Sequence, residues 1–113
     1  MTKHKTANAL LHGTLDALIL KTLAGGGPRH GYGIARSIES TSDDAVVVEE
    51  GSLYPALYRL ERRGWVVAEW TTSELGRRAK FYRLTQRGRT QLTAETEAWR
   101  LFAAGVSKIL LAQ

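Results

Sequence analysis

The segment from Ser52 to Arg63 constrains the fold of this chain more than any other stretch of its sequence. Three leucines in it fall on one face of a helix, four and three residues apart: Leu53, Leu57 and Leu60. Ser52 can cap such a helix, and Pro55 then falls in the first turn, where its missing N–H costs no intrahelical hydrogen bond. Gly64 follows in the position of a left-handed C-terminal cap. The segment therefore predicts a short amphipathic helix with one face in a core and the other face exposed.

Two more helices are predicted before this segment. The first begins after the cap Thr14 and ends at Gly25–Pro28, because three glycines and a proline do not continue a helix cheaply. The second runs from about Gly31 to Ser40 and ends in a turn-rich cluster of polar residues. The β-branched run Val46–Val48 is expected to form a brief strand before the third helix.

A hairpin and a long helix are predicted after the Ser52–Arg63 helix. Trp65–Trp70 and Lys80–Leu84 are rich in aromatic and β-branched residues, which favours two strands, and Gly76 marks the turn in the segment 73–79 that joins them. Thr85 is then placed to cap a last helix that reaches nearly to the end of the chain. We therefore expect a mainly α fold with a small β-hairpin (α+β), namely a winged helix-turn-helix plus a long C-terminal helix.

A chain of 113 residues is long enough for one hydrophobic core and too short for two. We expect residues 1–10 to form a flexible N-terminal arm, residues 11–86 a winged helix-turn-helix domain, and residues 87–113 a C-terminal helix.

The charge distribution is more informative than the net charge of +5, which a basic soluble protein of any function could carry. Between Ser52 and Thr90 the chain has nine cationic residues and only three acidic ones, Glu61, Glu69 and Glu74. Such a patch is the electrostatic footprint of a protein that binds nucleic acid. Its cationic members are Arg59, Arg62, Arg63, Arg77, Arg78, Lys80, Arg83, Arg87 and Arg89.

The outward face of the third helix supports the same interpretation. Tyr54 and Tyr58 carry hydroxyls suited to phosphate oxygens, and Arg59 and Arg62 could reach bases or the DNA backbone. The alternative is a solvated amphipathic helix of some other small domain, although two tyrosines and a proline are unusual for mere solubility.

Four segments resemble the PadR family of transcriptional regulators. In chain order they are similar to the family's opening helix, its HGYxI start of the second helix, its recognition-helix signature, and its wing and third strand, GRxxKxYxLT. These segments are Leu11–Leu20, His30–Ile34, Gly51–Gly64 and Gly76–Thr85. The resemblance extends roughly from residue 10 to residue 112, nearly the whole chain.

The resemblance implies a regulator that binds double-stranded DNA, and we expect a homodimeric repressor on an inverted-repeat operator. One departure from the family is the acidic pair Glu49–Glu50 before the recognition helix. Because carboxylates repel phosphates, we expect this pair to turn away from DNA or to pair with Arg62 or Arg63. The DNA contacts that the resemblance implies come from Tyr32, Ser52, Tyr54, Tyr58, Arg59, Arg77, Arg78 and Lys80.

The last helix carries an apolar stripe at near-heptad spacing, which needs a second surface to cover it. The resemblance implies a homodimer built from this helix and the first one, whereas packing on the chain's own first helix is the alternative. Trp99 raises a further possibility, because some PadR-like regulators bind planar drugs between aromatic residues at the dimer interface. The alternative is that Trp99 belongs to a core, as a buried aromatic residue at heptad spacing more often does. The expected interface residues are Leu92, Trp99, Phe102, Val106 and Ile109.

The sequence gives no support for catalysis, a metal site or a cofactor. There is no cysteine, and His4, His12 and His30 are scattered without metal-ligand spacing. The longest apolar stretch, Leu15–Leu23, is interrupted by charged residues and cannot span a bilayer. We therefore expect no membrane segment and a cytoplasmic protein. Two rival functions stay open. The first is a winged-helix module that binds an acidic protein partner instead of specific DNA, and the second, less favoured, is a small enzyme.

Overall fold

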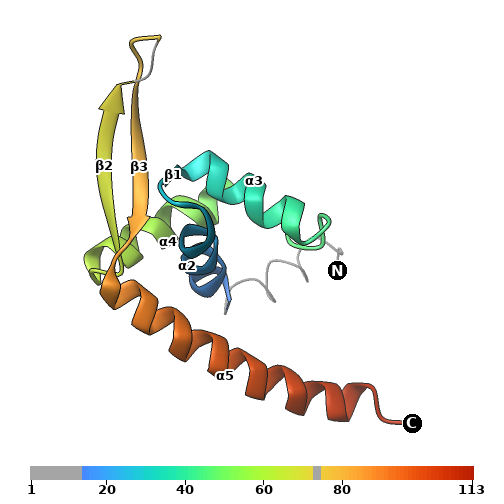
Figure 1. The fold of residues 1–113 in the computed structure, drawn as a ribbon. Coiled ribbons are helices and arrows are strands. Elements are labelled where there is room, and N and C mark those ends of the chain that lie inside the picture. Colours follow the sequence, from blue (N-terminus) through green and yellow to red (C-terminus); the bar gives the residue numbers. More distant parts are fainter. Residues whose placement is uncertain (1–13, 73–74) are drawn as a thin grey trace.

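The elements follow the predicted order of helices and hairpin in the computed structural model, which describes residues 14–72 and 75–113. The predicted N-terminal arm, residues 1–10, lies outside the described residues. Figure 1 shows helices gathered around the base of a β-hairpin in one body, from which the rest of the hairpin and a long helix project. The elements are α2 (Leu15–Gly26), β1 (Arg29–His30), α3 (Gly31–Thr41), α4 (Glu50–Arg62), β2 (Val66–Thr72), β3 (Arg78–Leu84) and α5 (Gln86–Leu110). The predicted α+β winged helix-turn-helix fold is confirmed.

The hydrophobic core lies where α2, α3 and α4 meet the base of the sheet. Burying one aliphatic side chain of this size stabilises a fold by about 1.5–3 kcal/mol, so this cluster carries most of the favourable free energy of the body. The predicted leucine face of α4 is confirmed as part of it. The largest side chains that are less than 2 % exposed are Ile19, Leu20, Ile34, Leu53, Leu57 and Leu60.

The C-terminal end of α4 follows the prediction. Gly64 has φ +77°, and its N–H donates to the carbonyl of Glu61 at 3.0 Å. The N–H of Trp65 donates to the carbonyl of Leu60 at 3.0 Å. This pair of hydrogen bonds is a Schellman motif, and it satisfies carbonyl groups that the helix end would otherwise leave without donors.

The N-terminal end of α4 differs from the prediction, because the helix begins at Glu50 and not after Ser52. The N–H groups of Ser52 and Leu53 both donate to the carbonyl of Glu49, at 3.0 and 2.9 Å, which extends the helix backwards. A carboxylate such as that of Glu50 is also favourable at the positive end of the helix dipole. Pro55 consequently lies inside the helix, where it removes one backbone hydrogen bond, and the prediction that it falls in the first turn is wrong.

The sheet has three antiparallel strands in the order β1-β3-β2. β2 and β3 form the predicted hairpin, with register from Val66↔Leu84 to Thr72↔Arg78, and Gly76 has the positive φ (+77°) expected of its turn. The prediction of a strand at Val46–Val48 is wrong, because these residues lie in a loop. The third strand is instead β1, two residues long, which pairs with the middle of β3.

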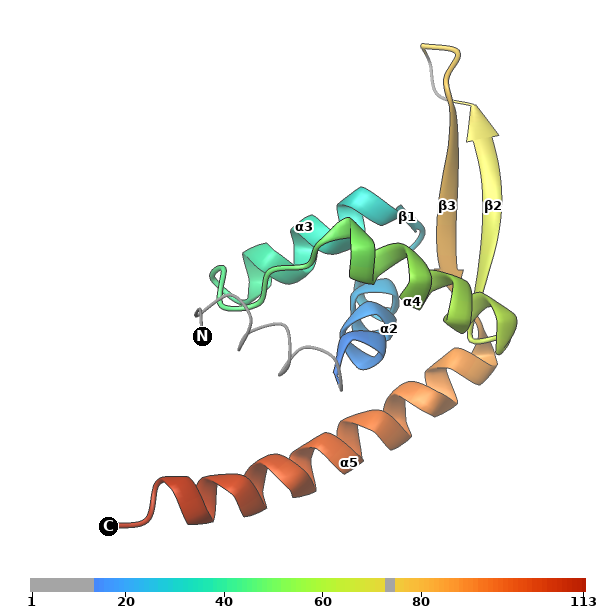
Figure 2. The same ribbon diagram turned by 180° about the vertical axis from the view of Figure 1, so that it is seen from behind.

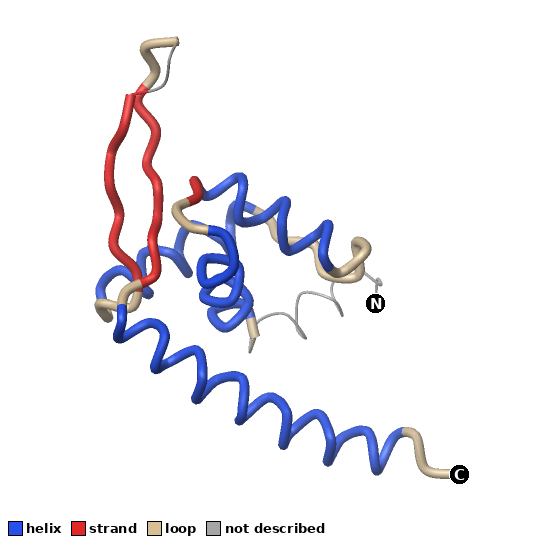
Figure 3. The backbone as a smooth tube through the Cα atoms, viewed as in Figure 1, coloured by secondary structure: helices blue, strands red, loops and turns tan. Residues whose placement is uncertain are grey.

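The junction between the hairpin and α5 is tightly packed. Thr85 caps α5 as predicted: its Oγ1 accepts from the N–H of Gly88 at 3.0 Å and donates to the carbonyl of Gly64 at 2.7 Å. Gly88 is buried, and a Cβ there would lie 2.1 Å from the carbonyl oxygen of Trp65. These contacts fix the direction in which α5 leaves the body, as a single long helix along the lower side of Figure 3.

Candidate nucleic-acid interface

The outward face of α4 carries two exposed tyrosines. Tyr54 is 45 % exposed and Tyr58 is 60 % exposed, one helical turn apart. Arg62 follows Tyr58 by another turn, its Nη1 donates to the Tyr58 hydroxyl at 3.4 Å, and its guanidinium lies 5.6 Å from the centre of that ring. The structure thus places the predicted residues Tyr54, Tyr58 and Arg62 in one row along the exposed side of the helix.

Arg59 lies on the same helix but has a partner in α2. Its Nη2 donates to Oδ1 of Asp16 at 2.8 Å, and Nη1 of Arg63 lies 3.9 Å from the other oxygen of that carboxylate. The sequence did not indicate this contact, because Asp16 stands 43 positions earlier and looks like an ordinary first-turn acid. Arg59 is therefore tied to the body by an ion pair that is partly exposed on both sides.

The acidic pair Glu49–Glu50, at the N-terminal end of α4, does not meet the arginines at the other end of the helix. Glu50 and Arg62 are the first and last residues of the helix, which separates them by about 18 Å at 1.5 Å per residue. The expected pairing of Glu49 or Glu50 with Arg62 or Arg63 is therefore wrong. Those arginines contact Tyr58 and Asp16 instead.

Tyr32, in the first turn of α3, is 64 % exposed and lies near the N-terminal half of α4. The two helices approach closely here, because a Cβ on Gly31 would lie 2.8 Å from Cε1 of Tyr54. A hollow of about 180 Å³ between the helices is lined by both tyrosines, with Arg36, Glu39 and other residues around it. Ser52 is exposed on the first turn of α4, so the predicted residues of both helices reach the surface.

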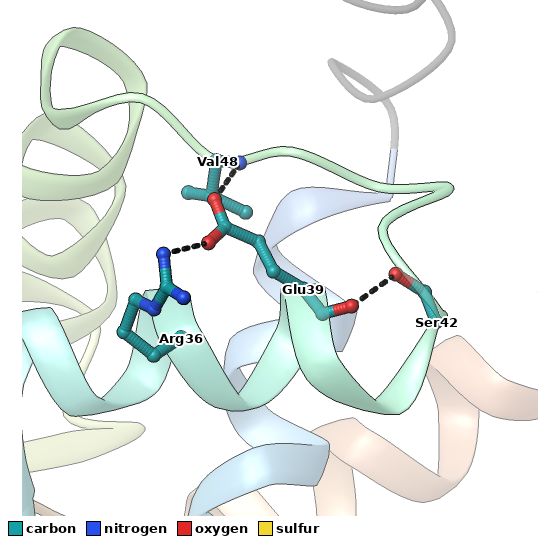
Figure 4. Close-up of polar contacts among 4 residues, drawn as sticks. All are labelled: Arg36, Glu39, Ser42 and Val48. Carbon is teal, nitrogen blue, oxygen red and sulfur yellow. Dashed lines mark hydrogen bonds and ion pairs between the residues drawn. The ribbon is translucent and has the colours of Figure 1, made fainter.

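The loop between α3 and α4 is held by Glu39, as Figure 4 shows. Oε2 of Glu39 accepts from the N–H of Val48 at 3.1 Å, and Oε1 accepts from Nη1 of Arg36 at 3.2 Å. The backbone carbonyl of Glu39 accepts from the Ser42 hydroxyl at 3.2 Å. The hydrogen bond to Val48 explains why the valine run does not form a strand: a side chain occupies the donor that a neighbouring strand would need. This network sets the point at which α4 begins.

The hairpin contributes the predicted wing residues. Arg77 and Arg78 are exposed near its tip, and Lys80 lies further down β3. Nζ of Lys80 is 3.6 Å from Oε1 of Glu61, so an ion pair joins the hairpin to α4. Burial raises the pKa of the neighbouring Tyr82 hydroxyl above its ordinary value, and the charge of Lys80 partly offsets this shift.

The apolar stripe of α5 is uncovered beyond its first turns. Leu92 packs partly against the core, whereas Trp99 is 52 %, Phe102 67 % and Ile109 77 % exposed. The rings of Trp99 and Phe102 are 6.4 Å apart, and Val106 is half-buried. An apolar face of this kind on an otherwise polar helix is typical of an interaction surface.

The part of the chain that the structure describes contains neither a cluster of metal ligands nor a membrane-spanning helix. Over residues 14–72 and 75–113, no three His, Asp or Glu side chains gather as a metal site would require. No helix in these ranges combines the length and the apolar character needed to cross a membrane. His30 has a structural role, since its Nδ1 accepts from the N–H of Gly33 at 3.0 Å and so caps α3.

Residues 19–94 match the model of the "Transcriptional regulator PadR-like family". A transcriptional regulator from Clostridium thermocellum is similar in structure, with a TM-score of 0.82 and 29% sequence identity over 90% of this chain and 98% of that one. A PadR family transcriptional regulator from Eggerthella lenta has a TM-score of 0.78 and 30% identity, over 97% and 93% of the two chains. A PadR-like transcriptional regulator from Bacillus cereus has a TM-score of 0.77 and 26% identity, over 93% and 99%.

Proposed function

Because the chain belongs to the PadR-like family of transcriptional regulators, whose members bind DNA and are not enzymes, we propose that it is a homodimeric repressor of an inverted-repeat operator. Residues 11–86 form the DNA-binding unit in this proposal, and residues 87–113 form the dimerisation helix.

One observation carries the proposal: α4, with its exposed tyrosines, is joined directly to the hairpin that bears the wing cations. The ion pair between Glu61 and Lys80 joins the two elements. In both Figure 1 and Figure 2 the hairpin projects beyond the body in one direction, while α5 runs along the opposite side of α2. Two copies joined through α5 would thus leave both DNA-binding faces free.

The proposed roles follow from the chemistry of each side chain. Tyr54 and Tyr58 hold phosphates through their hydroxyls, and Arg62, ordered by Tyr58, reaches a base edge or the backbone. Tyr32 and Ser52 add contacts from the N-terminal turns of α3 and α4. The wing residues Arg77, Arg78 and Lys80 hold phosphates beside the groove that α4 enters.

Asp16 holds one guanidinium nitrogen of Arg59 in the free protein, and in this proposal Arg59 exchanges that carboxylate for a base or phosphate of DNA. An exposed ion pair is worth about 0.2–1 kcal/mol, whereas a good bidentate contact to a base gives about 1–3 kcal/mol of discrimination. The exchange is therefore favourable for the correct base and is not favoured for a wrong one. In this proposal the Asp16 carboxylate holds the Arg59 side chain in the free protein until DNA replaces it.

The dimer would be formed by Leu92, Trp99, Phe102, Val106 and Ile109 of two α5 helices, with the first helix of each copy beside them. Such a dimer presents two recognition helices to successive major grooves, which are about 34–36 Å apart on one side of the duplex. The neighbouring rings of Trp99 and Phe102 would also form the wall of an effector site for a planar small molecule that relieves repression. Loss of operator binding on adding such a molecule, absent in Trp99→Ala, would support this part.

The test compares the wild type with Arg77→Ala/Arg78→Ala on the promoter upstream of the gene and on random duplex, by gel shift at several salt concentrations. We expect specific binding for the wild type, and for the variant weaker binding to both duplexes with a salt slope reduced by about 0.9 per lost phosphate contact. A double variant that matches the wild type would overturn the wing assignment. Equal affinity of the wild type for both duplexes would favour the protein-interaction module.

A further inference from the structure

Trp70 is a large aromatic residue for which the proposed function above has no role. It lies in β2 opposite Lys80 and is 57 % exposed. Side chains alternate between the two faces of a hairpin, so Trp70 shares its face with Val66, Tyr82 and Leu84, all of which are buried at the hairpin base. Trp70 therefore continues the inner face of the sheet outward, past the point where the body covers it.

Two cations lie against the ring of Trp70. The guanidinium carbon of Arg78 is 5.0 Å from a ring centre of Trp70, and Nζ of Lys80 is 6.0 Å from it. Nζ of Lys80 is also 5.5 Å from the ring centre of Tyr82. From base to tip, aromatic and cationic side chains thus alternate along one face: Tyr82, Lys80, Trp70 and Arg78. We call these four residues the inner ladder.

The opposite face of the hairpin is arranged differently. There Nη2 of Arg83 lies 2.8 Å from Oε1 of Glu69, so a carboxylate already neutralises that cation. A cation on an aromatic ring keeps its full charge, and the in-plane N–H groups of a guanidinium stay available to an anion at its edge. On the inner ladder Glu61 offsets part of the charge of Lys80 from 3.6 Å, whereas Arg78 lies on the ring of Trp70 near the tip. The outer part of this face is therefore suited to a polyanion.

Exposed arginine and lysine side chains have about 2 kcal/mol of rotamer entropy, part of which is lost when they bind a phosphate. A ring that already orders the cation reduces this cost on binding. We propose that Trp70 is a positioning residue of the DNA interface, which holds Arg78 and Lys80 toward the phosphates beside the groove that α4 enters. This inference rests on the proposed function, because it takes DNA as the polyanion.

The experiment measures the binding of purified full-length variants to a fluorescein-labelled mixed-sequence duplex, by anisotropy over a series of salt concentrations. For Trp70→Ala we expect binding weaker by at most about two- to five-fold per wing, because the strength of a cation–π contact at an exposed site limits the ordering cost that the ring can remove. The salt slope should stay that of the wild type, because no charge is removed, whereas Arg78→Ala should lower it by about 0.9 per wing. Thr71→Ala, the next residue on the opposite face, is the matched control and should bind as the wild type does.

A double-mutant cycle separates positioning from mere folding. Once Arg78 and Lys80 are both alanine, replacing Trp70 should weaken binding no further, and Trp70→Phe should bind more tightly than Trp70→Leu, because only the former keeps a ring. Additive effects, or equal binding of the Phe and Leu variants, would overturn the inference. The inference would also be overturned if Trp70→Ala bound DNA with wild-type affinity while Arg77→Ala/Arg78→Ala bound it more weakly. That result would leave the proposed function intact. Wild-type binding by every one of these variants would remove the wing from the interface, and would overturn both this inference and the wing assignment of the proposed function.

Discussion

Replacing Gly88 by alanine should destabilise the protein, although the same change in the middle of a helix normally stabilises it. Gly88 lies in the first turn of α5, where the hairpin base crosses the helix. A Cβ at this position would lie 2.1 Å from the carbonyl oxygen of Trp65 and 2.6 Å from Cδ1 of Leu84. The nearer atom belongs to the backbone, so no side-chain rotation can relieve the contact.

The magnitude follows from the movement required. Carbon–oxygen contacts are comfortable from about 3.3 Å, so α5 must move by about 1.2 Å relative to Trp65. That displacement strains the hydrogen bond from the Thr85 N–H to the Trp65 carbonyl (3.1 Å) and the one from Thr85 Oγ1 to the Gly64 carbonyl (2.7 Å). Strained packing of this kind costs about 1–3 kcal/mol, and the gain in helix propensity offsets at most about 1 kcal/mol.

Gly105 provides the control, because it lies in the same helix with no atom within 4 Å of its built Cβ. Gly105→Ala should raise the free energy of unfolding by about 0.5–1 kcal/mol, and Gly88→Ala should lower it by about 1–2 kcal/mol. Urea denaturation followed by circular dichroism, at one protein concentration, measures both. Equal or greater stability of Gly88→Ala would refute the close packing of α5 on the hairpin base.

Three further outcomes are expected. Asp16→Asn should lower the free energy of unfolding by at most about 1 kcal/mol and tighten DNA binding, because Arg59 then gives up no ion pair when it binds DNA. Unchanged or weaker binding would show that Arg59 does not exchange Asp16 for DNA. Trp99→Glu/Phe102→Glu should be monomeric by light scattering at concentrations where the wild type is dimeric, and a dimeric variant would exclude this face as the interface. Burial raises the pKa of Tyr82, so folding favours its neutral form; the resulting stability is complete below about pH 10 and is lost as pH rises through the folded pKa. Tyr82→Phe should therefore lose less stability between neutral and alkaline pH than the wild type does.

Local patterns in the sequence predicted the elements that carry the proposed interface. The leucine spacing placed the buried face of α4, Gly64 marked its end, and Thr85 marked the start of α5. Each of these signals acts within one or two helical turns, where periodicity and capping chemistry decide the conformation.

Contacts between distant residues could not be predicted in the same way. The two residues of β1 carry no strand pattern of their own and form a strand only because β3 passes beside them. Asp16 looks like a first-turn acid until α4 packs across α2 and brings Arg59 to it. The hydrogen bond from Val48 to Glu39 likewise depends on how the loop folds back over α3, and it overrides the β propensity of the valines.

Selection of bound duplexes from a random-sequence library tests the proposed function most directly. The purified wild-type chain should enrich an inverted repeat whose half-site centres are about one helical turn apart, 10–10.5 base pairs, or a multiple of it. Arg77→Ala/Arg78→Ala should enrich the same sequence more weakly, because the wing holds phosphates and α4 reads bases. Enrichment of a single half-site, or of no sequence at all, would contradict a homodimer that reads DNA through α4.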